Sequence, residues 1–428
     1  MSWITHVLLL AACFTVPHVG RAQVARPADA LDLQGAMRLA RETAPGLRAA
    51  DARRDVALGR AREAGQFLNP TIEYRRENLG SVLSPDIFAT LYLPFDVTGR
   101  RLAMRRTGGA AADRASADGV ADRRDAELRV ARAWVRTAAA GEQVLIARAQ
   151  ADALMEVART DSTRAREGLI ADGAALRSRL EADRVRVALS AAVGDLARAR
   201  AELSRVLGVS DRELPRVGEL VAPSLPNAPD SAEARDLAAR ARPELTAREA
   251  GIREAQARLS TEQRGALGDW QLQGGSKKTA GVMTGQLGLA LPLPLFNRND
   301  GARLRARGEL AEATAWRDEV AIGVRADAIA ALTAYLEVRT NAADAATFAP
   351  RGREVASIAR AAYREGHASL VELLDAERAA ADAMSAHLRW TVDAWLTRLE
   401  LERALGVRLD TDSPLDLPLR AALPSTSR

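Results

Sequence analysis

The sequence is poor in the residues on which enzymes and compact cores usually depend. Its 428 residues include one cysteine, four histidines and only 4% aromatic residues. A single cysteine excludes an intramolecular disulfide. After residue 22 the only histidines are His367 and His387, and no HExxH, GxSxG or phosphate-loop motif is present. We therefore expect no catalytic residue, no cofactor and no metal site, and a protein that is not an enzyme.

Lysine is nearly absent as well, since it occurs only at positions 277 and 278. The formal net charge of +5 comes from arginine, which alternates with acidic residues, as in residues 123–129. Such alternation is typical of a solvated helix surface and not of a basic nucleic-acid footprint. We expect no nucleic-acid partner. The abundance of Ala, Arg, Leu and Glu with helical periodicity indicates long helices or coiled coils.

Long apolar runs are also missing. Residues 7–16 form an apolar run too short to span a bilayer, and Gly20-Arg21-Ala22 follows it, which predicts a signal peptide over residues 1–22. Cys13 also fits a lipoprotein cleavage pattern and would then be lipidated, but the apolar run before it would be very short, so cleavage after Ala22 is favoured. No other segment approaches 18 apolar residues. The exported chain either stays in the periplasm or enters a membrane as β-strands.

The chain is an internal duplication. Equivalent segments recur about 200 residues apart. Pro45 and Pro243 open similar helices, the sequence Arg-Glu-Gly occurs at 166–168 and at 364–366, and Leu-Gly closes a later helix at 207–208 and at 405–406. A repeat this long is a duplicated half-molecule and not a solenoid unit. We expect a first structural repeat over 23–208, a linker over 209–230, a second repeat over 231–406, and a C-terminal tail over 407–428 that is disordered from residue 410.

Each half is predicted to hold a β-hairpin, at about 71–95 and 270–293, and a long helical hairpin, at about 99–207 and 297–405. The second hairpin strands are expected at 270–276 and 282–291, around a Gly/Ser/Lys turn. About 65 residues of uninterrupted helix in each half, the second over 297–363, would make rods near 100 Å long. Trp134 and Tyr335 occupy equivalent places and are expected to pack in the core.

The second rod carries two apolar seams at coiled-coil spacing. The first comprises Val324, Ala328, Ala331, Tyr335 and Val338, and the second Ile322, Ile329, Leu332 and Leu336. Two adjacent seams predict neighbours on two sides, as in a closed ring of helices.

Four strands cannot close a barrel, and unpaired strand edges in lipid leave backbone groups unsatisfied at several kcal/mol each. Several chains would have to pool their strands, and three chains give 12, within the known range for outer-membrane barrels. The first strand is charged at Glu73, Arg75, Arg76 and Glu77, so it is expected above the bilayer or facing the lumen. Prolines suit the strand-to-helix junctions because they fit neither a sheet ladder nor a helix interior; they are Pro94, Pro292 and Pro294.

Two segments carry a resemblance. Residues 291–301, Leu-Pro-Leu-Pro-Leu-Phe-Asn-Arg-Asn-Asp-Gly, are similar to the strand-to-helix junction of heavy-metal-type members of the TolC family of outer-membrane efflux proteins. Residues 363–378 are similar to the second periplasmic tip and return helix of that family. The chain resembles this family over essentially its whole mature length. The first tip differs: it is longer than the second and lacks a serine equivalent to Ser369.

The resemblance implies a mainly α-helical fold with a small membrane β-barrel. Long antiparallel coiled-coil helices would form a trimeric α-helical tunnel, and four strands per chain would contribute to a 12-stranded barrel. It also implies a homotrimer in outer-membrane lipid, with a long periplasmic extension that docks a periplasmic adaptor (membrane fusion) protein and an inner-membrane pump of RND type. The protein would be a passive exit duct of a tripartite efflux system, with metal cations as the favoured cargo. Drug efflux and type I protein secretion remain alternatives, as does a periplasmic structural coiled-coil protein without a channel.

The two hairpin tips are the candidate sites. Gly168, Leu169, Gly366 and Ser369 are expected to dock the adaptor, and the glycines also suit the positive φ of a helix end. Carboxylates near the tips would recur around a trimer axis and could select cations or act as a gate, or they are solvated helix ends; they are Glu167, Asp172, Glu365, Glu372 and Asp375. His367 is expected to be a surface residue and not a metal ligand.

Overall fold

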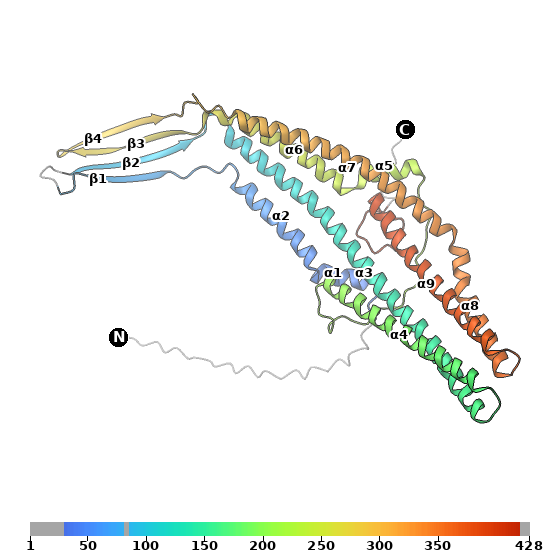
Figure 1. The fold of residues 1–428 in the computed structure, drawn as a ribbon. Coiled ribbons are helices and arrows are strands. Elements are labelled where there is room, and N and C mark those ends of the chain that lie inside the picture. The colour runs from blue at the N-terminus through green and yellow to red at the C-terminus, as the bar shows by residue number, and fades with distance from the viewer. Residues whose placement is uncertain (1–29, 81–84, 420–428) are drawn as a thin grey trace, which may run out of the picture.

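The computed structural model describes residues 30–80 and 85–419, and it shows an elongated molecule with a sheet at one end and long helices at the other (Figure 1). The predicted signal peptide, with Cys13, lies outside the described residues. The first half contains α1 (Leu33–Thr43), α2 (Pro45–Glu63), β1 (Thr71–Glu77), β2 (Asp86–Phe95), α3 (Arg100–Arg166) and α4 (Asp172–Leu207). The second contains α5 (Ser231–Ala241), α6 (Pro243–Gln263), the 3-10 turn η1 (Gly265–Leu267), β3 (Trp270–Thr279), β4 (Val282–Ala290), α7 (Asp300–Thr340), α8 (Ala342–Arg364) and α9 (Leu370–Leu405).

The two halves begin with the same helix chemistry. Carboxylates of Asp32 and Asp230 cap α1 and α5 by accepting backbone N–H bonds at 2.6–2.8 Å. Pro45 and Pro243 then occupy the first turn of α2 and α6, where a missing N–H costs nothing. The mostly helical fold with one small antiparallel sheet confirms the predicted fold class.

The first rod is continuous and the second is not. Helix α3 has 67 residues, so it is about 100 Å long. We expected an equally continuous rod over 297–363, but Asn341 divides it into α7 and α8. The Asn341 side-chain amide donates to the Glu337 carbonyl at 3.1 Å, while the Asn341 backbone N–H reaches that carbonyl only at 3.4 Å. The side chain thus competes for the helical acceptor, which explains the interruption.

Both helical hairpins turn at a glycine, at the end of the molecule farthest from the sheet (Figure 1). Gly168 follows α3 with φ +72°, and Gly366 follows α8 with φ +79°. The next amides, of Leu169 and His367, both donate back to the helix at 2.8 Å, to the carbonyls five residues earlier. This is the Schellman arrangement, which needs a left-handed residue and therefore favours glycine.

The core lies around the middle of the rods. One buried cluster packs α1 against α3, and another packs α5 against α7. Trp134 and Tyr335 are buried in them at 4% and 0% exposure, as predicted. Trp134 donates to the Leu31 carbonyl at 2.8 Å and Tyr335 to the Pro226 carbonyl at 2.7 Å. Burial raises the pKa of Tyr335 to about 12, so its hydroxyl remains a donor at neutral pH.

The expectation of a disordered tail is wrong for residues 410–419. Leu415 and Leu417 are buried in the first core cluster, and Arg408 pairs with Leu419 in a β-bridge. Apolar residues spaced two apart in a Pro-containing segment can cover a core without forming a helix or a long strand. The residues after Leu419 lie outside the described part of the chain.

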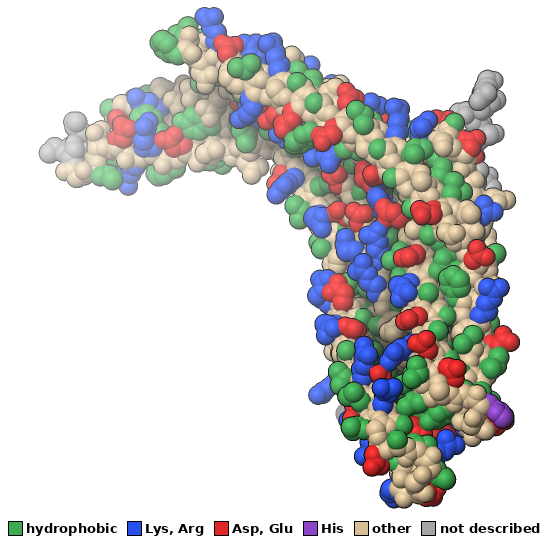
Figure 2. Space-filling view, turned by 45° about the vertical axis from the view of Figure 1, so that its right-hand side comes forward, with side chains coloured by type: hydrophobic (Ala, Val, Ile, Leu, Met, Phe, Trp, Pro, Cys, Tyr) green, Lys and Arg blue, Asp and Glu red, His purple; other side chains and the backbone are tan. Residues whose placement is uncertain are grey.

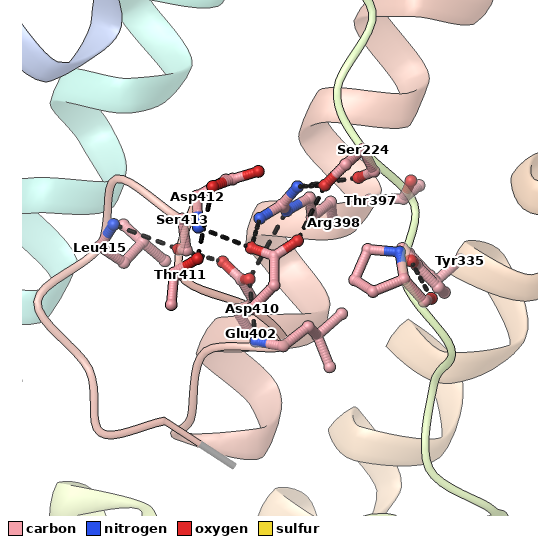
Figure 3. A network of polar contacts seen from close by, with 12 residues as sticks. Ser224, Tyr335, Thr397, Arg398, Glu402, Asp410, Thr411, Asp412, Ser413 and Leu415 are labelled. Atoms are coloured by element: carbon pink, nitrogen blue, oxygen red, sulfur yellow. Dashed lines mark hydrogen bonds and ion pairs between the residues drawn. The ribbon is translucent and has the colours of Figure 1, made fainter. Parts of the chain in front are cut away.

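A buried ionic network fastens this segment (Figure 3). The Arg398 guanidinium, 1% exposed, donates to the carbonyl and hydroxyl of Ser224 at 2.8 and 2.7 Å and forms ion pairs with Asp410 and Glu402. Glu402, fully buried, accepts from the Ser413 hydroxyl. Burial raises the pKa of Glu402. One arginine therefore joins α9, the linker between the halves and the C-terminal segment.

The sheet joins the two halves of the duplication. Its strands lie in the order β1-β2-β3-β4, and each neighbouring pair is antiparallel. Strands β2 and β3, from different halves, pair over Ile87↔Lys278 to Phe95↔Trp270. At Gly275 the backbones lie so close that a Cβ would sit 2.1 Å from the Ala89 carbonyl oxygen. Only glycine fits there.

Two boundaries at the sheet differ from the expectation. Strand β3 continues through the predicted Gly/Ser/Lys turn to Thr279, and the true turn is Ala280-Gly281, both with positive φ, as a two-residue hairpin loop requires. Pro94 lies inside β2, opposite Gln271, and not beyond the strand. It is accommodated because β1 has already ended its pairing at Tyr92, so β2 is an edge strand there. Pro292 and Pro294 do lie between β4 and α7.

Among the described helices, none is both long enough and apolar enough to cross a membrane.

The tip geometry makes a first prediction. Gly168→Ala forces a side chain into the left-handed region and should destabilise the tip by about 1–2 kcal/mol. Gly173→Ala is the matched control, because both glycines have open space at the Cβ position but only Gly168 has positive φ. The control should be neutral or stabilising by up to about 1 kcal/mol. Hydrogen exchange of the Leu169 amide measures the difference, and equal exchange in the two variants would contradict it.

The buried network makes a second prediction. Arg398→Ala leaves Glu402 and Asp410 without their cation and should lower the free energy of unfolding by about 3–5 kcal/mol. Arg389→Ala, on the exposed face of the same helix, should change it by less than about 0.5 kcal/mol. Guanidinium unfolding followed by circular dichroism gives both values. Similar stability of the two variants would show that the network does not hold the C-terminal segment.

Candidate functional site

The first candidate site is the sheet, whose two faces differ in chemistry. The strand register places Glu73, Arg75 and Glu77 of β1 on the same face as Thr90 and Tyr92 of β2. Hydrogen bonds link this polar face: Tyr92 donates to Glu73 at 2.7 Å, and Gln286 of β4 donates to Thr90 at 2.7 Å. The charges of the first strand are thus gathered mostly on one side.

The opposite face is apolar and exposed. It carries Ile72 and Tyr74 of β1, with 77% and 67% exposure, and Leu287 of β4 with 81%. By register it also contains Leu91, Leu93, Leu272, Met283 and Leu289. At its helix-proximal end, Phe95 and Trp270 form an edge-to-face pair with ring centroids 6.1 Å apart. An apolar patch of this kind marks an interaction surface.

Both outer strands of the sheet have free edges. Within the described residues, β1 pairs only with β2, and β4 pairs only with β3. Unpaired backbone donors and acceptors along an exposed strand are a template for pairing with another chain. The sheet is therefore incomplete in a single chain.

The second candidate site is formed by the hairpin tips. At the first tip, Leu169 is 69% exposed and Gly168 is exposed next to it. At the second tip, Gly366 is exposed. Ser369 caps α9 through a reciprocal capping box with Glu372: the Glu372 amide donates to the Ser369 hydroxyl at 3.3 Å, and the Ser369 amide to the Glu372 carboxylate at 2.7 Å. The first tip has Ala171 at the equivalent position and no such cap.

The predicted carboxylates lie at the tips, but one chain does not bring them together. Glu167, Asp172, Glu365 and Asp375 are exposed. Glu365 lies 4.0 Å from the imidazole of His367, itself exposed. The hydrogen bonds from Ser369 lower the pKa of Glu372, which is therefore ionised and serves the capping box. In the described part of the chain, no group of three or more His, Cys, Asp or Glu side chains could hold a metal ion. Figure 2 shows acidic and basic side chains interspersed down the rods to the tips.

A contact between the tips was not predicted from the sequence. The Tyr363 hydroxyl of α8 donates to the Asp161 carboxylate of α3 at 2.6 Å. Asp161 is fully buried, and its second oxygen has no hydrogen-bond partner in the described residues. Burial is the main cause that raises the pKa of Tyr363, and the hydrogen bond to Asp161 raises it further. The only signal was Tyr363 itself, one of four tyrosines, placed in the last helical turn before a tip.

Two further arginines join the hairpins near this pair. Arg164 of α3 stacks over the Tyr363 ring at 5.7 Å and donates to the Arg364 carbonyl at 3.3 Å. Arg378 of α9 forms an ion pair with Glu181 of α4 at 2.7 Å. The two hairpins are therefore held side by side near the tips by these polar bonds together with a small apolar cluster of Leu154, Ala158, Ala182 and Leu374.

Known proteins share this fold. Residues 36–209 match the family model described as outer membrane efflux protein, and no curated protein sequence matches the chain. CusC, in crystal structures concerned with folding and transmembrane channel formation, has 17% identity and a TM-score of 0.72 over 88% of this chain and 92% of that one. VceC of Vibrio cholerae has 20% identity and a TM-score of 0.71, over 87% of this chain and 96% of that one. The CmeC outer membrane channel of Campylobacter jejuni has 15% identity and a TM-score of 0.74, over 87% of this chain and 85% of that one.

The structural matches, at these low identities, establish the fold, and the family match over residues 36–209 supplies the link in sequence. The matching family model and the matching structures are those of outer-membrane proteins and channels and not of enzymes, in agreement with the expectation from the sequence. The family match over residues 36–209 and the shared fold bear out the resemblance stated above: the chain has the fold of TolC-like outer-membrane efflux proteins.

Proposed function

We propose that three copies of the chain form a passive exit duct of a tripartite efflux system. The observation that carries the proposal is the two-faced sheet with two free edges, placed at one end of rods about 100 Å long. The apolar face contacts outer-membrane lipid, and the polar face lines the water-filled lumen. The rods extend into the periplasm, and an inner-membrane pump of RND type supplies the energy.

The free edges fit a closed ring. Strand β4 runs antiparallel to β1, because the sheet has four strands and each neighbouring pair is antiparallel. The β4 edge of one copy can therefore pair with the β1 edge of the next in the same antiparallel pattern. Three copies supply 12 strands, and closure leaves no backbone edge in lipid.

The rods also leave apolar residues for neighbouring copies to cover. On α4, Leu176, Leu180 and Val187 are 66–70% exposed. On the second rod, Ile322 of α7 and Ile358 of α8 are 70% and 62% exposed. The first seam predicted on that rod is buried within the chain except for Val338, which is half-buried. The second seam exposes Ile322 and Leu336 but buries Leu332 in the chain's own core. Its exposed part is the surface we assign to an adjacent copy in a closed helical tunnel.

The tips are the proposed docking and closing end of the tunnel. Gly168, Leu169, Gly366 and Ser369 would form the adaptor-docking surface, because they are the turn residues farthest from the sheet. The Tyr363–Asp161 bond, which ties one hairpin to the other, would hold the tip closed. Around a three-fold axis the tip carboxylates would recur as rings that favour cations.

Metal cations are the cargo that the sequence favours. The support is the junction segment over 291–301, similar to that of heavy-metal-type family members, together with exposed carboxylates at both tips. Cells that lack the protein would then become sensitive to metal salts. Sensitivity to drugs alone would instead favour the drug-efflux alternative.

A charge placed on the apolar face tests membrane insertion. Leu287→Arg puts a cation in lipid and should cost about 2–4 kcal/mol per copy. The amount of assembled protein should therefore fall strongly, and it can be measured in outer-membrane fractions. Thr284→Arg, on the same strand but on the polar face, should assemble like the wild type. Equal loss in both variants, or in neither, would contradict the assignment of the faces.

Closure at the tip makes a second functional prediction. Tyr363→Phe removes the hydrogen bond to Asp161. The buried Asp161 carboxylate is then left without that partner, which costs about 1–3 kcal/mol or more and destabilises the closed tip. Single-channel conductance in planar bilayers should rise severalfold. The control Tyr335→Phe loses a comparable bond, to the Pro226 carbonyl in the core, and should leave the conductance unchanged. A Tyr363→Phe channel that conducts like the wild type would refute this role.

A further inference from the structure

The far end of the apolar face carries two cations. The strand register aligns Arg76 of β1, Ile87 of β2 and Lys278 of β3 in one row across the sheet, followed by Met283 of β4. Arg76 and Lys278 are exposed. Since neighbouring strands are about 4.8 Å apart, their backbones lie about 10 Å from each other. Within the described residues, neither side chain forms an ion pair.

The neighbouring cations on the polar face are engaged differently. Arg75 and Lys277 flank the ring of Phe88, with cation-to-centroid distances of 4.8 and 5.1 Å. Arg75 also lies 3.3 Å from the Glu77 carboxylate. The acidic residues of this end, Glu73, Glu77 and Asp86, share the polar face with them. The cations on the apolar face therefore have no carboxylate partner on their own side of the sheet.

The position of this row along the strands is informative. The aromatic pair Phe95–Trp270 marks the helix-proximal end of the apolar face. Ile87 precedes Phe95 by eight residues in β2 and lies toward the opposite end of the sheet. At about 3.3 Å per residue this is about 26 Å of strand, close to the ~25 Å height of an outer-membrane apolar band. Tyr74 lies one row before the cations, on the same face, as an amphipathic ring does at an interface.

We propose that Arg76 and Lys278 bind phosphate groups of a phosphorylated glycolipid in the outer leaflet. This rests on the proposed function, which turns the apolar face toward lipid. Arginine binds phosphate through paired N–H groups, and lysine does so as a point charge. Ile87 and Met283, which is 71% exposed, provide apolar contact for the lipid beside its headgroup. That apolar contact favours a lipid over free phosphate. Each assembled ring would carry three such sites.

Lipid binding by the full-length protein in detergent tests the proposal, with native mass spectrometry to count bound lipid. The probes are bisphosphorylated lipid A, dephosphorylated lipid A and inorganic phosphate. The double variant Arg76→Gln/Lys278→Gln removes both cations. The charge-matched control Arg75→Gln/Lys277→Gln removes two cations from the opposite face. Circular dichroism checks the fold, and the single variants Lys278→Gln and Lys277→Gln replace any pair that fails to fold.

We expect the double variant to bind bisphosphorylated lipid A about 30-fold more weakly, since each surface cation contributes about a factor of five. The control should bind it like the wild type, and dephosphorylated lipid A should bind weakly to all three. Equal affinity of the double variant and the wild type, equal losses in both variants, or tight binding of inorganic phosphate with no preference for phosphorylated lipid would overturn the proposal. Because binding is read in detergent, absent conductance of the wild type would count against the exit duct and not against this site.

Discussion

The backbone groups of strands β1 and β4 impose the strongest constraint on this molecule. Each strand pairs on one side only within the described residues, and the sheet to which they belong has one apolar and one polar face. In lipid, every unpaired donor or acceptor costs several kcal/mol. A chain with this sheet must therefore find partners for its edges, and the even number of strands allows identical copies to supply them in antiparallel register.

The helical part follows a different logic. Alanine-rich rods bury little area per residue, and the chain concentrates its large buried side chains, such as Trp134, Tyr335 and Arg398, in a belt around the middle of the rods. Beyond that belt the hairpins are joined by polar contacts, such as Tyr363–Asp161, and by a small apolar cluster around Leu154 and Leu374. Such contacts hold the tips in one arrangement without a large apolar interface, so the tips are the part of the molecule best suited to change shape.

Much of the fold could be read from the sequence, because proline, glycine and capping residues fix helix ends locally. The duplication and the positive φ at Gly168 and Gly366 are of this kind. Contacts between distant segments could not be read. Asp161 looks like any surface carboxylate until α8 brings Tyr363 to it, and the packed tail depends on Arg398 meeting Asp410 and Glu402. Asn341 was missed because an asparagine within a helical pattern gives no sign of whether its side chain will compete for a carbonyl.

The account depends on closure of the sheet by identical copies, and the mass of the assembly tests this most directly. Native mass spectrometry of the protein extracted from outer membranes in mild detergent should give three chains, stable on heating because their strands form one continuous sheet. A single chain that stays monomeric, with its β1 and β4 edges open in the same detergent, would contradict the account.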